Sequence, residues 1–188
     1  MKKIVIGVAS AFLACSIIAG TVATASSMKP MTSTSNVSME YYFPRAGQAP
    51  EPVLLNLIKS AKSSVDMAIY SFTDTDISSA LIAEKKKGIT VRVITDRTEA
   101  SGKYQKALLA TLKKAGIPVK INSHSGLMHL KVTIVDKGTA TTGSFNYTKG
   151  AETENDEVFV VVNNSTVAKN FDSEFVTMWN DTKDYKSY

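Results

Sequence analysis

The sequence predicts an α/β fold, an α/β/α sandwich in which helices cover both faces of a central mixed β-sheet. Two observations lead to this class. Between residues 40 and 121, short apolar strands alternate with amphipathic helices, which is typical of strands joined by right-handed helical crossovers. After residue 123, three strands follow one another with little helix between them, before a final amphipathic helix. No internal repeat is visible in the chain.

Apolar periodicity predicts the elements of the first half. We expect strands over residues 40–43, 64–72, 89–95 and 117–121, and helices over residues 51–63, 76–87 and 102–115. Asp76 is the expected cap of the second helix, which ends in Lys85, Lys86 and Lys87 before Gly88. Cations are favourable in the last turn of a helix, so we interpret these lysines as a helix terminus rather than a nucleic-acid surface.

The second half is predicted to contain strands over residues 129–135, 140–144 and 157–162 and a helix over residues 165–182. Lys137 and Gly138 lie between the first two of these strands and predict a hairpin. Because alternate residues of a strand share a face, His129 and Lys131 would project together while Leu130 points the other way.

The first 25 residues are typical of a secretory signal peptide. Lys2 and Lys3 precede an apolar run to about Gly20, and an Ala-x-Ala sequence ends at Ala25. If left uncut, a run of about 20 apolar residues could nearly span a bilayer. We therefore expect a signal peptide over 1–25, a flexible tether over 26–38 and the folded domain over 39–188. The protein would then be exported to the periplasm or the medium, with no stable membrane association after cleavage.

Composition limits the chemistry available to this domain. The chain has 22 Lys and Arg, 17 Asp and Glu, a net charge of +5, two histidines and one cysteine. Cleavage after Ala25 would remove Cys15 and two lysines and lower the charge to +3. With no cysteine cluster and no evident carboxylate cage, neither a metal nor a cofactor is expected. The modest positive charge permits an anionic partner without demonstrating one.

Residues with chemistry suited to phosphate are concentrated between positions 129 and 146. If the two strands pair as a hairpin, the side chains of His129, Lys131, Ser144 and Asn146 can converge, and Gly143 would allow the backbone to come close. An imidazole, a cation, a hydroxyl and an amide in one place are suited to binding a phosphate group.

These positions also form the pattern H-x-K-x4-D-x6-G-S-x-N, with Asp136 as its acidic member, and so resemble the signature of the phospholipase D superfamily. Residues 68–73, 80–83, 142–154 and 179–185 are similar to the compact, single-motif branch of bacterial Nuc-type endonucleases. The resemblance covers about residues 41–188 and implies the fold of that family.

In that branch, an acidic residue beyond the asparagine supports the catalytic histidine. Glu157 matches this place, although Glu152, Glu154 and Asp156 lie near enough to compete with it. Asp136 has the opposite strand parity to His129, so we expect it to fix the hairpin backbone rather than to act on substrate.

The resemblance implies phosphodiester hydrolysis without a metal, through a phosphohistidine formed on His129. Lys131, Ser144 and Asn146 would bind the non-bridging oxygens, and Glu157 would fix the imidazole tautomer. Larger members pair two motif histidines, but this chain has one motif, and His124 has the wrong parity to replace the second. We therefore expect a homodimer with a shared site.

The expected substrate is DNA, or RNA, cut without sequence specificity. A phospholipase D-type lipid phosphodiesterase and a non-catalytic nucleic-acid-binding protein on the same fold are the alternatives.

Overall fold

The computed structural model describes residues 36–188, which build one eight-stranded sheet in the order β1-β7-β6-β5-β2-β3-β4-β8. The strands are β1 (Ser38–Tyr42), β2 (Ser64–Ile69), β3 (Thr90–Thr95), β4 (Val119–Asn122), β5 (Lys131–Val135), β6 (Thr139–Gly143), β7 (Phe159–Asn163) and β8 (Tyr185–Ser187). Strands β2, β3 and β4 run parallel, and the other neighbouring pairs are antiparallel. The predicted α/β class with a mixed sheet is confirmed.

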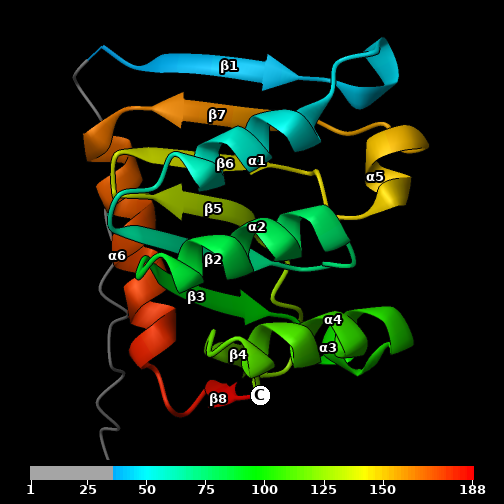
Figure 1. Ribbon diagram of the computed structural model, residues 1–188, viewed down its shortest axis with the longest axis vertical. Helices are drawn as coiled ribbons and strands as arrows, with labels where there is room; N and C mark the ends of the chain where they lie inside the picture. The colour runs from blue at the N-terminus through cyan, green and yellow to red at the C-terminus, as the bar shows by residue number, and fades with distance from the viewer. Residues whose placement is uncertain (1–35) are drawn as a thin grey trace, which may run out of the picture. The chain divides into compact units, whose positions relative to one another are not determined.

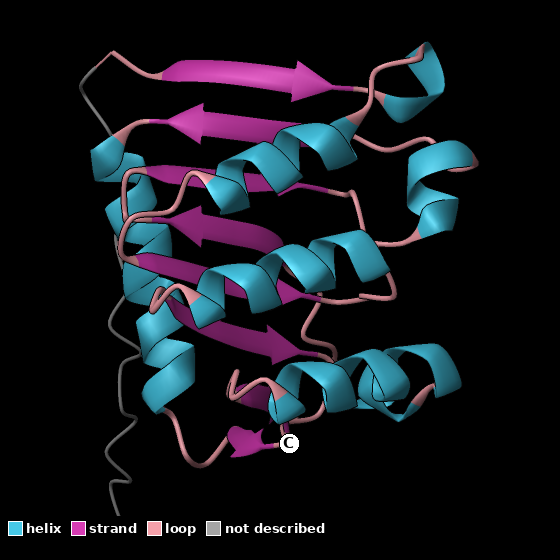
Figure 2. Cartoon of the chain, viewed as in Figure 1, coloured by secondary structure: helices cyan, strands magenta, loops and turns pink. Residues whose placement is uncertain are grey.

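Helices cover both faces of the sheet (Figures 1 and 2). They are the 3-10 helix η1 (Pro44–Ala46) and the α-helices α1 (Pro50–Lys59), α2 (Thr75–Lys86), α3 (Arg97–Ser101), α4 (Lys103–Lys114), α5 (Lys149–Thr153) and α6 (Ser165–Asn180). Helices α1, α2 and α4 lie on one face, and α6 crosses the other. The predicted signal peptide, residues 1–25, and most of the predicted tether lie outside the described residues.

Two apolar cores lie on opposite faces of the sheet because strand side chains alternate. Leu54, Leu81 and Leu109, one from each of α1, α2 and α4, pack on the first face. Phe175 and Met178 of α6 pack on the second. The period-two and helical patterns of the sequence therefore correspond to real buried faces. Among residues 36–188, no helix is long and apolar enough to cross a membrane.

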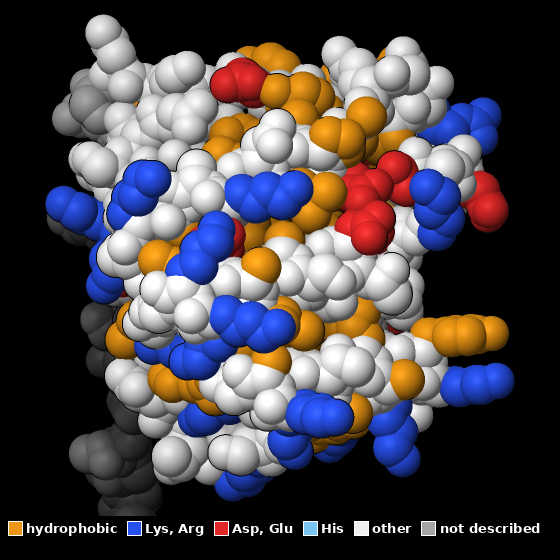
Figure 3. All heavy atoms as spheres, in the orientation of Figure 1, with side chains coloured by type: hydrophobic (Ala, Val, Ile, Leu, Met, Phe, Trp, Pro, Cys, Tyr) orange, Lys and Arg blue, Asp and Glu red, His pale blue; other side chains and the backbone are white. Residues whose placement is uncertain are grey.

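The lysine run at the end of α2 is a helix terminus, as interpreted from the sequence. Lys85 and Lys86 occupy the last turn, and Lys87 is the C-cap. Gly88 follows with a positive φ of 93°, and Lys87 pairs with Glu84 at 2.7 Å. Lys and Arg side chains are spread over the face of the molecule that carries α1, α2 and α4 (Figure 3).

The N-terminal cap of α2 expected from the sequence is wrong. Asp74, not Asp76, accepts hydrogen bonds from the amides of Asp76 and Ile77.

The structure also contains elements that the sequence did not predict. Helices α3 and α5 have five residues each, and β8 has three. Such short segments lack a full amphipathic period, so their formation depends on tertiary contacts. Strand β1 starts at Ser38, one residue before the expected domain start, and β5 starts at Lys131, so His129 precedes its strand.

The turn between β5 and β6 is formed by Asp136 and Lys137, with φ angles of 52° and 54°. The carboxylate of Asp136 accepts hydrogen bonds from the amides of Lys62, Ser63 and Ser64 at 2.7–2.9 Å. Asp136 therefore anchors the α1–β2 connection. This corrects the expectation that it would fix the backbone of its own hairpin.

We expect the substitution Asp136→Asn to lower the free energy of unfolding by about 2 kcal/mol at pH 7, because one acceptor oxygen becomes a donor facing backbone N–H groups. Burial raises the pKa of Asp136, but the hydrogen bonds outweigh it and lower the pKa overall. A depressed pKa stabilises the fold above the unfolded value and loses this contribution at lower pH. The difference between wild type and variant should therefore shrink below about pH 4.

Urea unfolding at several pH values measures this difference. The exposed Asp76, which lies in the first turn of α2, supplies the matched control Asp76→Asn, expected to change stability by less than about 0.5 kcal/mol. Equal urea midpoints for wild type and Asp136→Asn at pH 7 would contradict the anchoring role.

Candidate active site

The candidate residues lie along the edge of the sheet that is formed by strand ends and not by an outer strand. At this edge β2 and β6 end and β5 and β7 begin (on the right in Figure 1). His129 lies two residues before the start of β5, Ser144 directly follows β6, and Glu157 lies two residues before β7. Antiparallel pairing of β5, β6 and β7 brings these three chain segments to the same edge.

His129 and Lys131 are in direct contact. The Nζ atom of Lys131 lies 3.0 Å from Nε2 of His129 and donates to the carbonyl oxygen of His129 at the same distance. An ammonium group has only donors, so the first contact suits an imidazole whose Nε2 is unprotonated and accepts a hydrogen bond from Lys131. His129 is exposed, whereas Lys131 is buried. An exposed imidazole is thus oriented by a buried cation.

Burial lowers the pKa of Lys131, and the negative charge of Glu157 opposes this shift in part. A cation in a site of low dielectric interacts strongly with an incoming anion, because less water screens its charge. Lys131 is therefore well placed to neutralise a phosphate oxygen next to His129.

Tyr70, which follows β2, is a site residue that the sequence did not indicate. Its ring centroid lies 4.5 Å from that of His129, and the Lys131 ammonium lies 5.0 Å from the same ring. The backbone carbonyl of Tyr70 accepts hydrogen bonds from Thr95 and from the buried Gln105. These bonds hold the backbone from which the ring projects toward the imidazole. The sequence shows a tyrosine at the end of an apolar strand, but it does not show that this tyrosine contacts His129, because that contact depends on the register of the sheet.

Ser144 and Glu157 form a second pair. The hydroxyl of Ser144 donates to the carboxylate of Glu157 and accepts from the amide of Val158 at 3.1 Å. Asn155 also donates to Glu157, at 3.1 Å. The resemblance implied that Glu157 supports His129, but within residues 36–188 its hydrogen bonds run to Ser144 and Asn155, because the imidazole is turned toward Lys131 and Tyr70.

Two of the three competing acids near Glu157 form ion pairs elsewhere. Glu152 pairs with Lys149 at 2.5 Å, and Asp156 lies 3.7 Å from Arg45. Of the candidate acids, it is Glu157 that affects Lys131 electrostatically.

Gly143 and Asn146 shape the β6 end of the site. Gly143 has a φ of +132°, and a Cβ atom there would lie 2.1 Å from the carbonyl oxygen of Val158. Only glycine fits this close approach. The side-chain oxygen of Asn146 accepts a hydrogen bond from the amide of Ser71 at 3.3 Å, which ties the amide group to the end of β2.

The loop that carries His129 is held from β3. The carboxylate of Asp96, 1% exposed, caps α3 through the amides of Thr98 and Glu99 and also accepts from the amide of Met128 at 3.0 Å. The sequence feature that could have indicated Asp96 is its position as an acid directly after an apolar strand.

The other histidine, His124, packs edge-on against Tyr185, with their ring centroids 5.7 Å apart.

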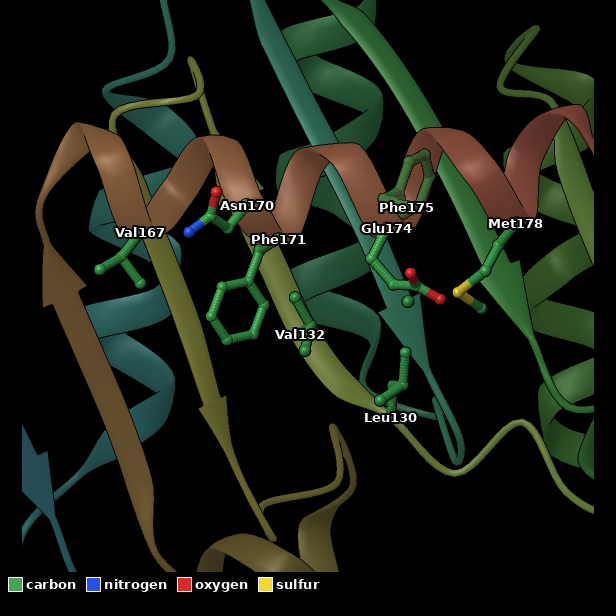
Figure 4. A pocket seen from close by; sticks show the side chains of 9 residues that line it. Leu130, Val132, Val167, Asn170, Phe171, Glu174, Phe175 and Met178 are labelled. Atoms are coloured by element: carbon green, nitrogen blue, oxygen red, sulfur yellow. The ribbon is translucent and has the colours of Figure 1, made fainter. Parts of the chain in front are cut away.

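An apolar groove lies behind this edge, between α6 and the sheet (Figure 4). It has a volume of about 330 Å³, and its lining includes Leu130, Val132, Phe171 and Met178. Leu130, between His129 and Lys131 in the chain, is 41% exposed. Leu130 lines the groove, whereas its neighbours His129 and Lys131 contact each other away from it.

No group of three or more His, Cys, Asp or Glu side chains that could hold a metal ion is present in the described part of the chain. The arrangement at the edge offers an imidazole, a buried cation, a hydroxyl and an amide. Together these groups can attack phosphorus and bind the oxygens around it.

Comparison with known proteins shows which proteins this chain is similar to. A family model described as "Cardiolipin synthase, PLD-like domain" matches residues 54–179. Phospholipase D of Rickettsia conorii is 35% identical over 118 residues, which cover 63% of this chain and 58% of that protein. Mitochondrial cardiolipin hydrolase of Danio rerio is 33% identical over 138 residues, covering 73% of this chain and 60% of the relative. The chain thus spans about three-fifths of the length of these curated relatives.

Two solved structures are similar over nearly their whole length. Nuc from Salmonella typhimurium, a phospholipase D family member, has a TM-score of 0.74 and 36% identity, covering 81% of this chain and 99% of that one. NucT from Helicobacter pylori has a TM-score of 0.69 and 26% identity, covering 77% and 96%.

Proposed function

The chain belongs to the phospholipase D superfamily and has its phosphodiesterase fold, and from this premise we propose that it is an exported endonuclease. It hydrolyses phosphodiester bonds of DNA or RNA without sequence specificity and without a metal ion. The contact between His129 Nε2 and the buried Lys131 carries this proposal, because it provides a nucleophile and a charge for the phosphate together. The near-complete match to Nuc favours a nucleic acid as substrate.

In the first step, the ammonium of Lys131 turns from Nε2 of His129 to a phosphate oxygen, and the released Nε2 lone pair attacks phosphorus, forming a P–N bond as the P–O bond to the leaving alkoxide breaks. Lys131 and Asn146 bind the non-bridging oxygens, and Ser144 adds a hydroxyl. In the second step, water attacks the phosphohistidine and releases a phosphomonoester and the free imidazole. Glu157 holds Ser144 and balances the charge of Lys131.

The leaving alkoxide needs a proton, and we propose that it comes from His129 of a second subunit in a two-fold homodimer. The ring of His124 packs against Tyr185, and no contact joins it to His129 or Lys131 among those of residues 36–188. If the two copies of His129 meet, the adjacent Leu130 must lie close to the partner chain. Its exposed side chain would then be covered, which stabilises such a dimer by burial of apolar surface.

A lipid phosphodiesterase is the second candidate, favoured by the names of the curated relatives. One experiment separates the two. The purified protein is incubated with plasmid, single-stranded DNA, RNA and phospholipid vesicles, each with excess chelator, and the products are quantified.

We expect the nucleic acids to be cleaved and the vesicles to remain intact, with chelator changing the rate less than about twofold, because Lys131 performs the charge neutralisation that a metal would otherwise supply. Hydrolysis confined to vesicles would overturn the nuclease assignment, and strong chelator inhibition would overturn the metal-free mechanism. Binding of DNA with no hydrolysis of any substrate would favour a non-catalytic protein.

A further inference from the structure

A separate cavity lies beside the candidate active site, and we propose that it binds the nucleobase of a nucleotide flanking the scissile phosphate. The cavity has a volume of about 540 Å³, and its lining includes Phe43, Arg45, Ser144, Asp156 and Glu157. This inference rests on the proposed nuclease function, since only a nucleic-acid substrate brings a base to this place.

The position of the cavity suits a neighbouring nucleotide rather than the reacting phosphate. Phe43 follows β1, and His129 precedes β5. The order β1-β7-β6-β5 separates these two strand ends by three strand spacings, about 14 Å. Ser144 and Glu157 line the cavity and also belong to the candidate site, so a strand bound at His129 can continue into the cavity.

Phe43 is the aromatic group of the cavity, and its side chain is 48% exposed. Its backbone is held firmly: the amide donates to Gln48 at 2.7 Å, and the carbonyl accepts from the amide of Ala46 at 3.0 Å. The rigid 3-10 helix that begins at Pro44 follows directly. An exposed ring on a fixed backbone is a suitable platform for stacking a base, which is favourable for every base because each has a π-face.

The charges of the cavity favour a neutral heterocycle over a second phosphate. Arg45 donates to the carbonyl of Glu154 at 2.9 Å and lies 3.7 Å from Asp156. Glu157 is held by Ser144 and Asn155. Two carboxylates against one guanidinium repel an anion, but they accept hydrogen bonds from the amino and imino groups of a base, while Arg45 donates to its ring nitrogens and carbonyls.

Kinetics on single-stranded DNA test the stacking role. We expect Phe43→Leu to raise KM about tenfold with little change in kcat, because base stacking on an aromatic ring is lost while the reacting groups stay in place. The separate variant Phe43→Trp should keep the wild-type KM, because it retains an aromatic ring at this position. The matched control is Tyr104→Leu, which removes an aromatic side chain that is 72% exposed on α4 and should leave both constants unchanged.

A wild-type KM for Phe43→Leu would overturn the base subsite and leave the nuclease proposal intact. Absence of DNA cleavage by the wild-type protein would instead overturn the proposed function. The two failures are therefore distinguishable.

Binding without turnover gives a second measurement. The double variant Phe43→Trp, His129→Asn carries a tryptophan in the cavity, and His129→Asn alone corrects for the natural Trp179, the single tryptophan of the chain. We expect a deoxydinucleotide to quench the added fluorescence and phosphocholine to leave it unchanged. Quenching by phosphocholine alone would indicate a pocket for a lipid headgroup and overturn the proposal, as would quenching by neither probe.

Discussion

Replacing His129 by asparagine is expected to reduce kcat for DNA hydrolysis by at least about 10⁴-fold, because the nucleophilic nitrogen is removed. The amide oxygen of asparagine can still accept a hydrogen bond from Lys131, whose Nζ lies 3.0 Å from Nε2 in the native site. The buried cation therefore keeps a partner, and the fold should be retained. Plasmid cleavage rates and thermal unfolding of the same preparations measure the two effects separately.

The matched control is His124→Asn, the same substitution at the other histidine. His124 packs against Tyr185 in a loop, and the variant should cleave DNA at the wild-type rate. Comparable losses in both variants would show that imidazole chemistry at His129 is not the cause. Residual activity of His129→Asn near one-tenth of wild type would contradict a covalent role.

The variant also tests the shared site. If each dimer needs His129 from both subunits, adding an equal amount of His129→Asn protein to wild type and allowing subunits to exchange should lower the activity to about half. Mixed dimers would be inactive, and a quarter of all dimers would remain wild type. An unchanged rate after demonstrated exchange would mean that each chain acts alone.

Much of the fold follows from local sequence patterns, because long elements repeat their apolar period several times. The expected strand 64–72 and helix 165–182 correspond to β2 (Ser64–Ile69) and α6 (Ser165–Asn180). The cap of α2 was misassigned because Asp74 and Asp76 are equally acidic, and extended backbone angles at Asp74 decide between them. Sequence composition carries no information on such angles.

The candidate site also contains features that local sequence predicts and features that it does not. Parity of side chains along one segment correctly predicted that His129 and Lys131 project together, since they contact each other. Tyr70 faces them from a neighbouring strand, in a register set by the pairing of Ile69 with Lys131. The partners of Asp136 lie more than 70 residues upstream. Contacts between residues so far apart in the sequence depend on the assembled sheet, and no local sequence pattern predicts them.

Gly143→Ala should have the largest effect on folding. We expect it to lower the free energy of unfolding by about 3 kcal/mol or more, because the backbone angle is strained for any L side chain and the new Cβ overlaps Val158. The carbonyl of Val158 accepts from the amide of Ser144 at 3.0 Å, so β6 and β7 must separate at their ends to relieve the 2.1 Å approach. Urea unfolding measures the loss.

Gly138→Ala is the matched control, because a Cβ atom at Gly138 meets nothing closer than 3.9 Å and its φ is not positive. It should change stability by less than about 0.5 kcal/mol. Separation of β6 from β7 also pulls Ser144 away from Glu157, so Gly143→Ala should lose DNA cleavage even at temperatures where the protein remains folded. A folded Gly143→Ala protein with wild-type cleavage would mean that the contact between Ser144 and Glu157 is dispensable for the reaction.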